Sequence, residues 1–172
     1  AMRQLDARIE LVICGSSSAQ MPTFGEWERV VLSHTYPDID FISCHASYQE
    51  RDGDLDSFLA SGVEMDGFIE SVVATADHVR AQKGLAKRIN ISFDEWNVWY
   101  MDRFEKVDRI EGIDNWPISP RLLEDVYSVA DAVVFGSLLI SLLKHSDRVA
   151  SASLAPLVNV IAPIMTEPGG PA

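Results

Sequence analysis

The sequence has 172 residues, of which 47% are hydrophobic and 23% are charged, enough for one globular domain with a substantial core. It carries 26 acidic residues against 14 basic ones, so its formal net charge is −12. A surface this acidic repels phosphate backbones and anionic lipid head groups, which argues against nucleic-acid and membrane-surface partners. It is compatible with a neutral substrate such as a sugar.

The cysteines and histidines give no sign of a cofactor. Cys14 and Cys44 each lie in an apolar run, which predicts buried thiols and no disulfide framework. The four histidines are scattered singly, so no metal-type spacing exists, and we expect neither a metal nor another cofactor. No signal-peptide pattern opens the sequence. The most apolar stretch, residues 129–143, is interrupted by Asp131 and is too short to cross a bilayer.

Short β-rich runs alternate with helical patterns along the chain. Strands are predicted at residues 9–14, 39–45, 89–93 and 149–158. Between them, helices are predicted at residues 27–34 and over most of 55–82, with Lys83-Gly84 as a stop, and from Ser119-Pro120 onward. The last helix carries one apolar stripe at helical spacing, made of Leu122, Val126, Val129, Val133, Gly136, Ile140 and Leu143. Residues 101–115 are predicted to form a charged loop.

Strand–helix–strand alternation predicts a parallel sheet with helical crossovers. Four such units are half of a (β/α)8 barrel, which typically needs about 250 residues. The alternative is a small open doubly wound sheet, which usually has a Gly-rich phosphate loop after its first strand. Here the first strand ends in Gly15-Ser16-Ser17-Ser18, and neither G-x-G-x-x-G nor a P-loop is present. The barrel is therefore favoured.

In parallel α/β folds, reactive groups lie at the carboxyl ends of strands. The third predicted strand ends in Asp94-Glu95-Trp96-Asn97, followed by Val98-Trp99-Tyr100. A sugar site needs aromatic platforms and carboxylates together, and a glycosidase needs an ionised carboxylate at the anomeric carbon. Glu95 has this chemistry. By strict alternation it shares a face with Phe93, although alternation often breaks at a strand exit; core aromatics beside solvated acids are the competing interpretation.

Three segments resemble glycoside hydrolase family 51 in order and spacing. They are MPTFGEWE at 21–28, ISFDEWNVWY at 91–100 and LVNVIAPI at 157–164. The resemblance implies an intracellular α-L-arabinofuranosidase, hence a cytoplasmic protein, with a (β/α)8 barrel and a C-terminal β-sandwich. It implies that the four strands are the fifth to eighth of the barrel, and that Glu95 is the catalytic nucleophile at the end of the seventh. Residues 1–162 are then a partial barrel, and 163–172 begin the connection to the sandwich, most of which the chain lacks.

The resemblance also implies a partner for Glu95 that this chain lacks. The family's general acid/base is a Glu following an Asn at the end of the fourth strand, and no Asn-Glu pair occurs in these 172 residues. A retaining mechanism needs a second carboxyl group about 5 Å from the nucleophile. With regular strand pairing, Asp94 points to the side opposite Glu95. The chain alone is therefore predicted to lack meaningful glycosidase activity.

The predicted substrate-binding residues are His45, Tyr48, Trp99 and Asn97. Two departures from the family bear on them. An aromatic residue usually stands two positions after the histidine, where this chain has Ser47, so either Tyr48 replaces it through a shifted loop or the contact is lost. A glutamine usually precedes Leu-Val-Asn, where this chain has Pro156, which has no side-chain donor.

The leading hypothesis is the nucleophile-bearing half of a retaining enzyme that releases terminal α-L-arabinofuranosyl residues from oligosaccharides. The alternative is a non-catalytic carbohydrate-binding or structural half-barrel, and a small open-sheet phosphate-binding protein has no motif in its favour. A half-barrel leaves two sheet edges and apolar surface open. We therefore expect a homo-oligomer or association with a missing N-terminal half.

Overall fold

The computed structural model describes residues 2–114, 116, 118, 123–167 and 169–170. Its elements alternate between strands and helices along most of the chain. In order they are α1 (Met2–Leu5), β1 (Val12–Ile13), α2 (Glu26–Thr35), β2 (Phe41–Tyr48), α3 (Leu55–Leu59), α4 (Ser61–Lys83), β3 (Asn90–Val98), α5 (Met101–Arg103), the π-helical turn η1 (Phe104–Asp108), α6 (Val129–Lys144) and β4 (Val149–Leu154). The alternation predicted from the sequence is confirmed.

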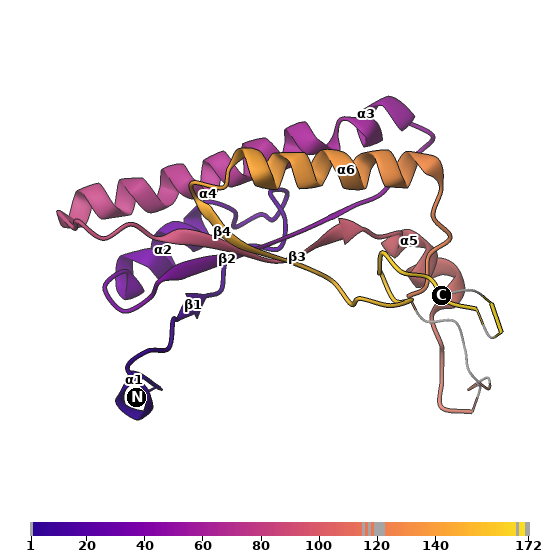
Figure 1. Ribbon diagram of the computed structural model, residues 1–172, viewed down its shortest axis with the longest axis horizontal. Helices are drawn as coiled ribbons and strands as arrows, with labels where there is room; N and C mark the ends of the chain where they lie inside the picture. The colour runs from indigo at the N-terminus through magenta and orange to yellow at the C-terminus, as the bar shows by residue number, and fades with distance from the viewer. Residues whose placement is uncertain (1, 115, 117, 119–122, 168, 171–172) are drawn as a thin grey trace.

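The four strands form one sheet in the order β1-β2-β3-β4, and every neighbouring pair is parallel (Figure 1). The predicted parallel sheet with helical crossovers is therefore confirmed. β1 is only two residues long, shorter than expected. β3 is longer than expected: it continues through Glu95 to Val98, so the segment predicted as a strand exit is part of the strand. Because all strands run the same way, their carboxyl ends share one edge of the sheet.

The helices α2, α4 and α6 pack in a layer on one face of the sheet, with α4 and α6 side by side (Figure 1). α4 supplies the largest share of the core, through Met65, Phe68, Ile69, Val72, Ala76 and Val79. It ends where predicted: Gly84 adopts a φ of 62°, which a glycine tolerates without a Cβ penalty, and donates its N–H to the Ala81 carbonyl. The predicted helix over 55–82 is divided at Ala60 into α3 and α4.

The buried face of α6 differs from the one that its sequence pattern predicts. Residues 119–122, where the helix was predicted to begin, lie outside the described residues, and α6 begins after Ser128, whose hydroxyl accepts the Asp131 N–H. The predicted apolar stripe is not the buried face: Val129 and Ile140 are 82% and 68% exposed. The buried face instead carries Asp131, Val134, Leu138, Ser141 and Leu142. A helix buries whichever face meets its neighbours, and sequence spacing alone does not name that face.

Hydrogen bonds and ion pairs between side chains join α4 to α6 and to the sheet. Asp66 on α4 accepts hydrogen bonds from Ser141 and Lys144 on α6, both at 2.6 Å. Burial alone would raise the pKa of Asp66, but these bonds outweigh it and hold the pKa below its usual value. Nearby, the buried Arg148 guanidinium donates to both carboxylate oxygens of Asp77, at 2.7 and 3.2 Å, and ties β4 to α4.

Candidate active site

A β-bulge in β3 sets the direction of Glu95. Cys44 pairs with Phe93, but the next residue of β2, His45, pairs with Glu95, so Asp94 is an extra residue without a partner in β2. An inserted residue reverses the inward–outward alternation downstream of it. Before the bulge, Phe93 is fully buried on the helix-covered face, whereas Glu95 emerges on the opposite face beside His45.

The two side chains that the bulge aligns approach each other. Glu95 Oε2 lies 3.9 Å from His45 Nδ1, and the side chains are 45% and 40% exposed. A carboxylate and an imidazole thus share one face in the carboxyl-terminal halves of neighbouring parallel strands, open to a ligand. The structure therefore brings together two of the side chains singled out from the sequence.

Asp94 does not follow the expectation drawn from regular pairing. Its carboxylate accepts a hydrogen bond from the Ser92 hydroxyl, which is also 3.0 Å from the Ser151 hydroxyl on β4. Ser92 precedes the bulge and alternates with the buried Phe93, so it lies on the same face as Glu95. Asp94 is thus held toward that face, not on the side opposite Glu95, because the pairing is irregular.

Tyr48 lies on the other face of β2. The pairing of β2 stays regular from His45 to Tyr48, so Ser47 and not Tyr48 follows His45 on the open face. Tyr48 is 7% exposed, and burial raises the pKa of its hydroxyl. No shifted loop brings its ring to the His45–Glu95 face in this structure.

The aromatic and amide residues that follow Glu95 make structural contacts: Trp96 packs in the core, and Asn97 forms hydrogen bonds with the backbone. Trp96 is buried and stacks on Phe135 of α6, with ring centroids 5.2 Å apart, which favours core packing for this ring. Asn97 is also buried: its amide donates to the Ile161 carbonyl and its oxygen accepts the Val98 N–H, both at 2.8 Å. Trp99 is partly exposed just beyond β3 and donates its backbone N–H to the Tyr48 carbonyl at 2.8 Å.

Sequence reasoning missed Glu28, a fully buried carboxylate whose hydrogen bonds reach the loop after β1. Its two oxygens accept the N–H groups of Ser16 and Gly25, at 2.8 and 2.7 Å. The Ser16 carbonyl in turn accepts the His45 N–H at 3.3 Å, so Glu28 supports the backbone that carries His45. The available signal was a glutamate at the third position of α2, where a carboxylate reaches back to the start of the helix.

Among the described residues, no group of three or more His, Cys, Asp or Glu side chains is placed to hold a metal ion. Within the same residues, no helix is long and apolar enough to cross a membrane.

The chain has a parallel sheet with helical crossovers, and an acid and a histidine lie toward the carboxyl ends of two of its strands. This arrangement is typical of the α/β proteins whose sites lie on that side of the sheet. Residues 94–172 match the family described as alpha-L-arabinofuranosidase C-terminal domain. Within that match, the described elements are the end of β3, α5, η1, α6 and β4, so this part of the chain contains both helices and strands.

The curated relatives are arabinofuranosidases. An intracellular exo-α-(1→5)-L-arabinofuranosidase from Streptomyces lividans is 64% identical over 172 residues, covering 100% of this chain and 26% of the relative. An exo-α-(1→6)-L-arabinofuranosidase from Bifidobacterium longum is 60% identical over 176 residues, covering 99% of this chain and 34% of the relative. The chain thus spans about a quarter to a third of the length of these relatives.

Solved structures agree with the sequence comparison. A family 51 α-L-arabinofuranosidase from Bifidobacterium longum superposes with a TM-score of 0.88 at 49% identity, covering 99% of this chain and 36% of that one. An arabinose complex of the Thermotoga maritima α-L-arabinofuranosidase gives 0.71 at 28% identity, covering 96% and 29%. The chain is therefore similar to part of the α-L-arabinofuranosidases of glycoside hydrolase family 51.

Proposed function

We propose that this chain carries the nucleophile of a retaining exo-α-L-arabinofuranosidase, and that the nucleophile is Glu95. The observation that carries the proposal is the bulge at Asp94, which turns Glu95 to the open face beside His45. Bulges recur next to active sites, where they redirect a side chain. The names of the relatives support an arabinofuranoside oligosaccharide as substrate and a cytoplasmic location.

The chemistry assigned to Glu95 is a double displacement. Its carboxylate attacks the anomeric carbon of a terminal arabinofuranosyl unit as the bond to the leaving oxygen breaks, giving a covalent glycosyl ester. A general acid gives a proton to that oxygen, and the same group then takes a proton from water as the water attacks the anomeric carbon. Glu95 is released as a carboxylate. His45, 3.9 Å from Glu95, is positioned to orient the nucleophile or to bind the sugar.

The general acid/base is proposed to lie outside these residues. The 172-residue sequence contains no Asn-Glu pair, the pattern that the family resemblance implies for that role. Asp94 is engaged by the Ser92 hydroxyl and is not assigned to it. We therefore expect the chain alone to turn over arabinofuranosides no faster than a Glu95→Gln variant; a clear excess over that variant would refute this expectation.

The fold is proposed to be the second half of a (β/α)8 barrel, with residues 1–162 in the barrel and 163–172 leading toward a β-sandwich. Four parallel strands in sequential order, with helices on one face, support this assignment. Among the described residues, β1 and β4 each pair on one side only, which leaves two open sheet edges. Strands from an N-terminal half, or from a second copy of this chain, would cover those edges.

The direct test uses a mechanism-based arabinofuranosyl inactivator, which leaves its sugar on the nucleophile. The full-length protein that carries this chain is incubated with the inactivator, digested and analysed by mass spectrometry. Label on Glu95, lost in Glu95→Gln and retained in Asp94→Asn, is the expected result. Label on any other residue overturns the assignment.

A non-catalytic carbohydrate-binding half-barrel is the second candidate, and the positions of Ser47 and Pro156 favour it. Both stand where the family resemblance leads one to expect a sugar contact, and neither supplies an aromatic ring or an amide. This candidate predicts that an arabinofuranosyl ligand binds while the inactivator labels nothing.

A further inference from the structure

A second β-bulge lies in β4, next to the one in β3. Ile91 pairs with Val149, but the next residue of β3, Ser92, pairs with Ser151, so Ala150 is an extra residue of β4. Ile91 and Val149 are buried on the helix-covered face. With regular pairing, Ser151 would share that face with Val149. The inserted residue reverses the alternation, and Ser151 therefore lies on the open face beside Ser92.

The two bulges are joined by a chain of hydroxyl hydrogen bonds. The Ser92 hydroxyl donates to the Asp94 carboxylate and lies 3.0 Å from the Ser151 hydroxyl. A serine hydroxyl has one proton, and because Ser92 gives its own to Asp94, Ser151 is the donor of the second bond. The chain therefore runs from Ser151 on β4 through Ser92 to Asp94, the extra residue of β3.

The central hydroxyl of this chain is shielded from solvent. Ser92 is 8% exposed and lies between Ser43 on β2 and Ser151 on β4, at the same level of the sheet. A hydrogen bond from a hydroxyl to a carboxylate is stronger than one between neutral groups, and a low local dielectric strengthens it further. The Ser92–Asp94 bond is therefore a firm anchor for the Asp94 side chain.

The strand register does not itself hold Asp94. Between Phe93 and Trp96, β3 has two residues, Asp94 and Glu95, where β2 has His45 alone and β4 has one residue. Asp94 thus has no register partner in either neighbouring strand, and the ladder is locally disrupted there. The hydroxyl chain supplies a restraint at this point, through the side chain instead of the backbone.

Glu95 needs such a restraint because its own contact is loose. Its carboxylate lies 3.9 Å from His45, and both side chains are exposed, so this contact alone holds the carboxylate only weakly. A rotation of the backbone at Asp94 would move the whole Glu95 side chain, which is the next along the strand. For a reaction that needs atoms about 3–3.5 Å apart, a misplacement of about 1 Å can cost about a hundredfold in rate.

We propose that Ser92 and Ser151 are positioning residues for the nucleophile. They hold Asp94 in the bulge, and Asp94 fixes the backbone from which Glu95 reaches the open face. The inference rests on the proposed function, in which Glu95 attacks the anomeric carbon. Because the two serines act through Asp94 and not on the sugar, their loss is expected to slow the attack and to leave sugar binding unchanged.

The test measures how fast the arabinofuranosyl inactivator labels the full-length protein that carries this chain. The dependence of the labelling rate on inactivator concentration gives a limiting rate constant and a half-saturating concentration, and mass spectrometry gives the position and final amount of label. Ser92→Ala is expected to lower the limiting rate constant about ten- to hundredfold. Ser151→Ala leaves the Ser92–Asp94 bond in place and is expected to lower it about two- to tenfold. The half-saturating concentration is expected to stay unchanged in both.

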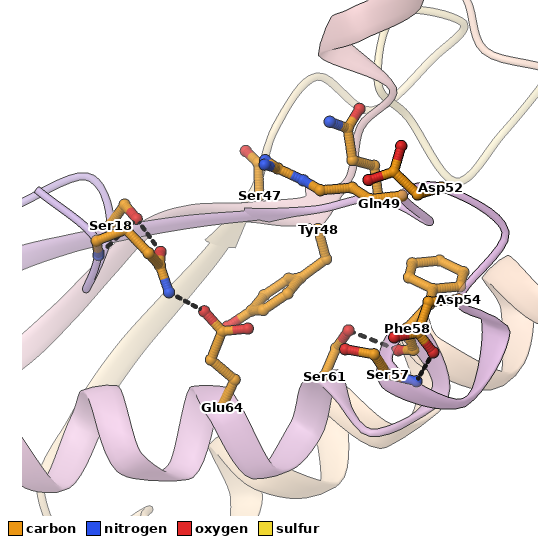
Figure 2. A pocket seen from close by; sticks show the side chains of 12 residues that line it. Ser18, Ser47, Tyr48, Gln49, Asp52, Asp54, Ser57, Phe58, Ser61 and Glu64 are labelled. Atoms are coloured by element: carbon orange, nitrogen blue, oxygen red, sulfur yellow. Dashed lines mark hydrogen bonds between the residues drawn. The ribbon is translucent and has the colours of Figure 1, made fainter.

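Two other serines provide matched controls. Ser43→Ala removes a hydroxyl from the same face and the same level of the sheet, but outside the hydrogen-bonded chain. Ser61→Ala removes a buried serine hydrogen bond, donated to the Phe58 carbonyl at 2.6 Å. Ser61 lies on α4 beside a polar cavity on the helix-covered side of β2, toward which Tyr48 also points (Figure 2). Both controls are expected to keep the original limiting rate constant, even where they lower thermal stability.

A rescue variant separates positioning from a general effect on folding. Ser151→Thr keeps the hydroxyl at an exposed position and is expected to recover most of the rate lost in Ser151→Ala. Unchanged limiting rate constants in both alanine variants, a change confined to the half-saturating concentration, or an equal loss in Ser61→Ala overturns the positioning role and leaves Glu95 as the nucleophile. Label on a residue other than Glu95 overturns the proposed function, and this inference with it.

Discussion

Replacing Glu28 by glutamine removes a charge from the interior while leaving the size of the side chain nearly unchanged. The carboxylate is fully buried, and each of its oxygens accepts one backbone N–H, from Ser16 and from Gly25. A glutamine has only one oxygen. Its amide group would therefore face one of these N–H groups, and that donor would lose its partner.

The expected destabilisation follows from that geometry. A hydrogen bond to a charged group contributes about 1.5–3 kcal/mol, and a buried donor left without a partner costs about 1–3 kcal/mol. Glu28→Gln is therefore expected to lower the free energy of unfolding by roughly 2–4 kcal/mol. Glu28→Ala should cost more, because it leaves both donors unpaired and opens a cavity.

Urea unfolding followed by tryptophan fluorescence measures this loss, and the His45 amide chemical shift reports whether the Ser16–His45 hydrogen bond changes with it. Glu26→Gln is the control: Glu26 lies on the same helix but is exposed and forms its ion pair with Arg29 on the surface. If Glu28→Gln were no more destabilising than Glu26→Gln, the buried carboxylate would not support the site in the way described.

Three further changes test other parts of the fold. Asp77→Ala leaves the buried Arg148 guanidinium without its carboxylate and should cost about 3 kcal/mol in urea unfolding; a loss below that of an exposed Asp→Ala variant contradicts it. Gly15→Ala places a Cβ 2.0 Å from the Ser43 carbonyl oxygen, so β1 must shift, and its amide chemical shifts should change with a loss of about 1–3 kcal/mol. The lowered pKa of Asp66 contributes stability that is fully present above about pH 4 and is lost as the pH falls through the folded-state pKa. Asp66→Asn should therefore flatten the acid side of the curve of unfolding free energy against pH. An unchanged curve would exclude this contribution.

The parallel sheet and the position of the Glu95 segment could be predicted because both rest on local signals. Apolar runs alternate with helical patterns, and the acid–aromatic motif follows such a run. The stop at Gly84 was equally local, since the turn needs a residue that tolerates a φ of 62°. Each of these features is fixed by residues close together in the sequence.

Features that depend on contacts between distant segments could not be predicted. The bulge exists because β2 pairs with β3 out of step at Asp94, and no property of the β3 sequence alone fixes that register. The buried face of α6 is chosen by α4 and β3, not by its most regular apolar stripe. The burial of Glu28 could not be predicted from its place near the start of a helix, because it depends on contact with the distant Ser16.

Because of the bulge, the side chains of β3 that face the helices change from odd-numbered to even-numbered positions along the strand. Up to Phe93, odd-numbered positions such as Ile91 face the helices; from Trp96 on, even-numbered positions do. If Asp94 instead paired with His45, regular alternation would turn Glu95 toward the helices and send Trp96 to the open face, whereas deletion of Asp94 would leave Glu95 opposite His45. The burial of Trp96 and the exposure of Glu95 therefore both depend on Asp94 staying outside the pairing with β2.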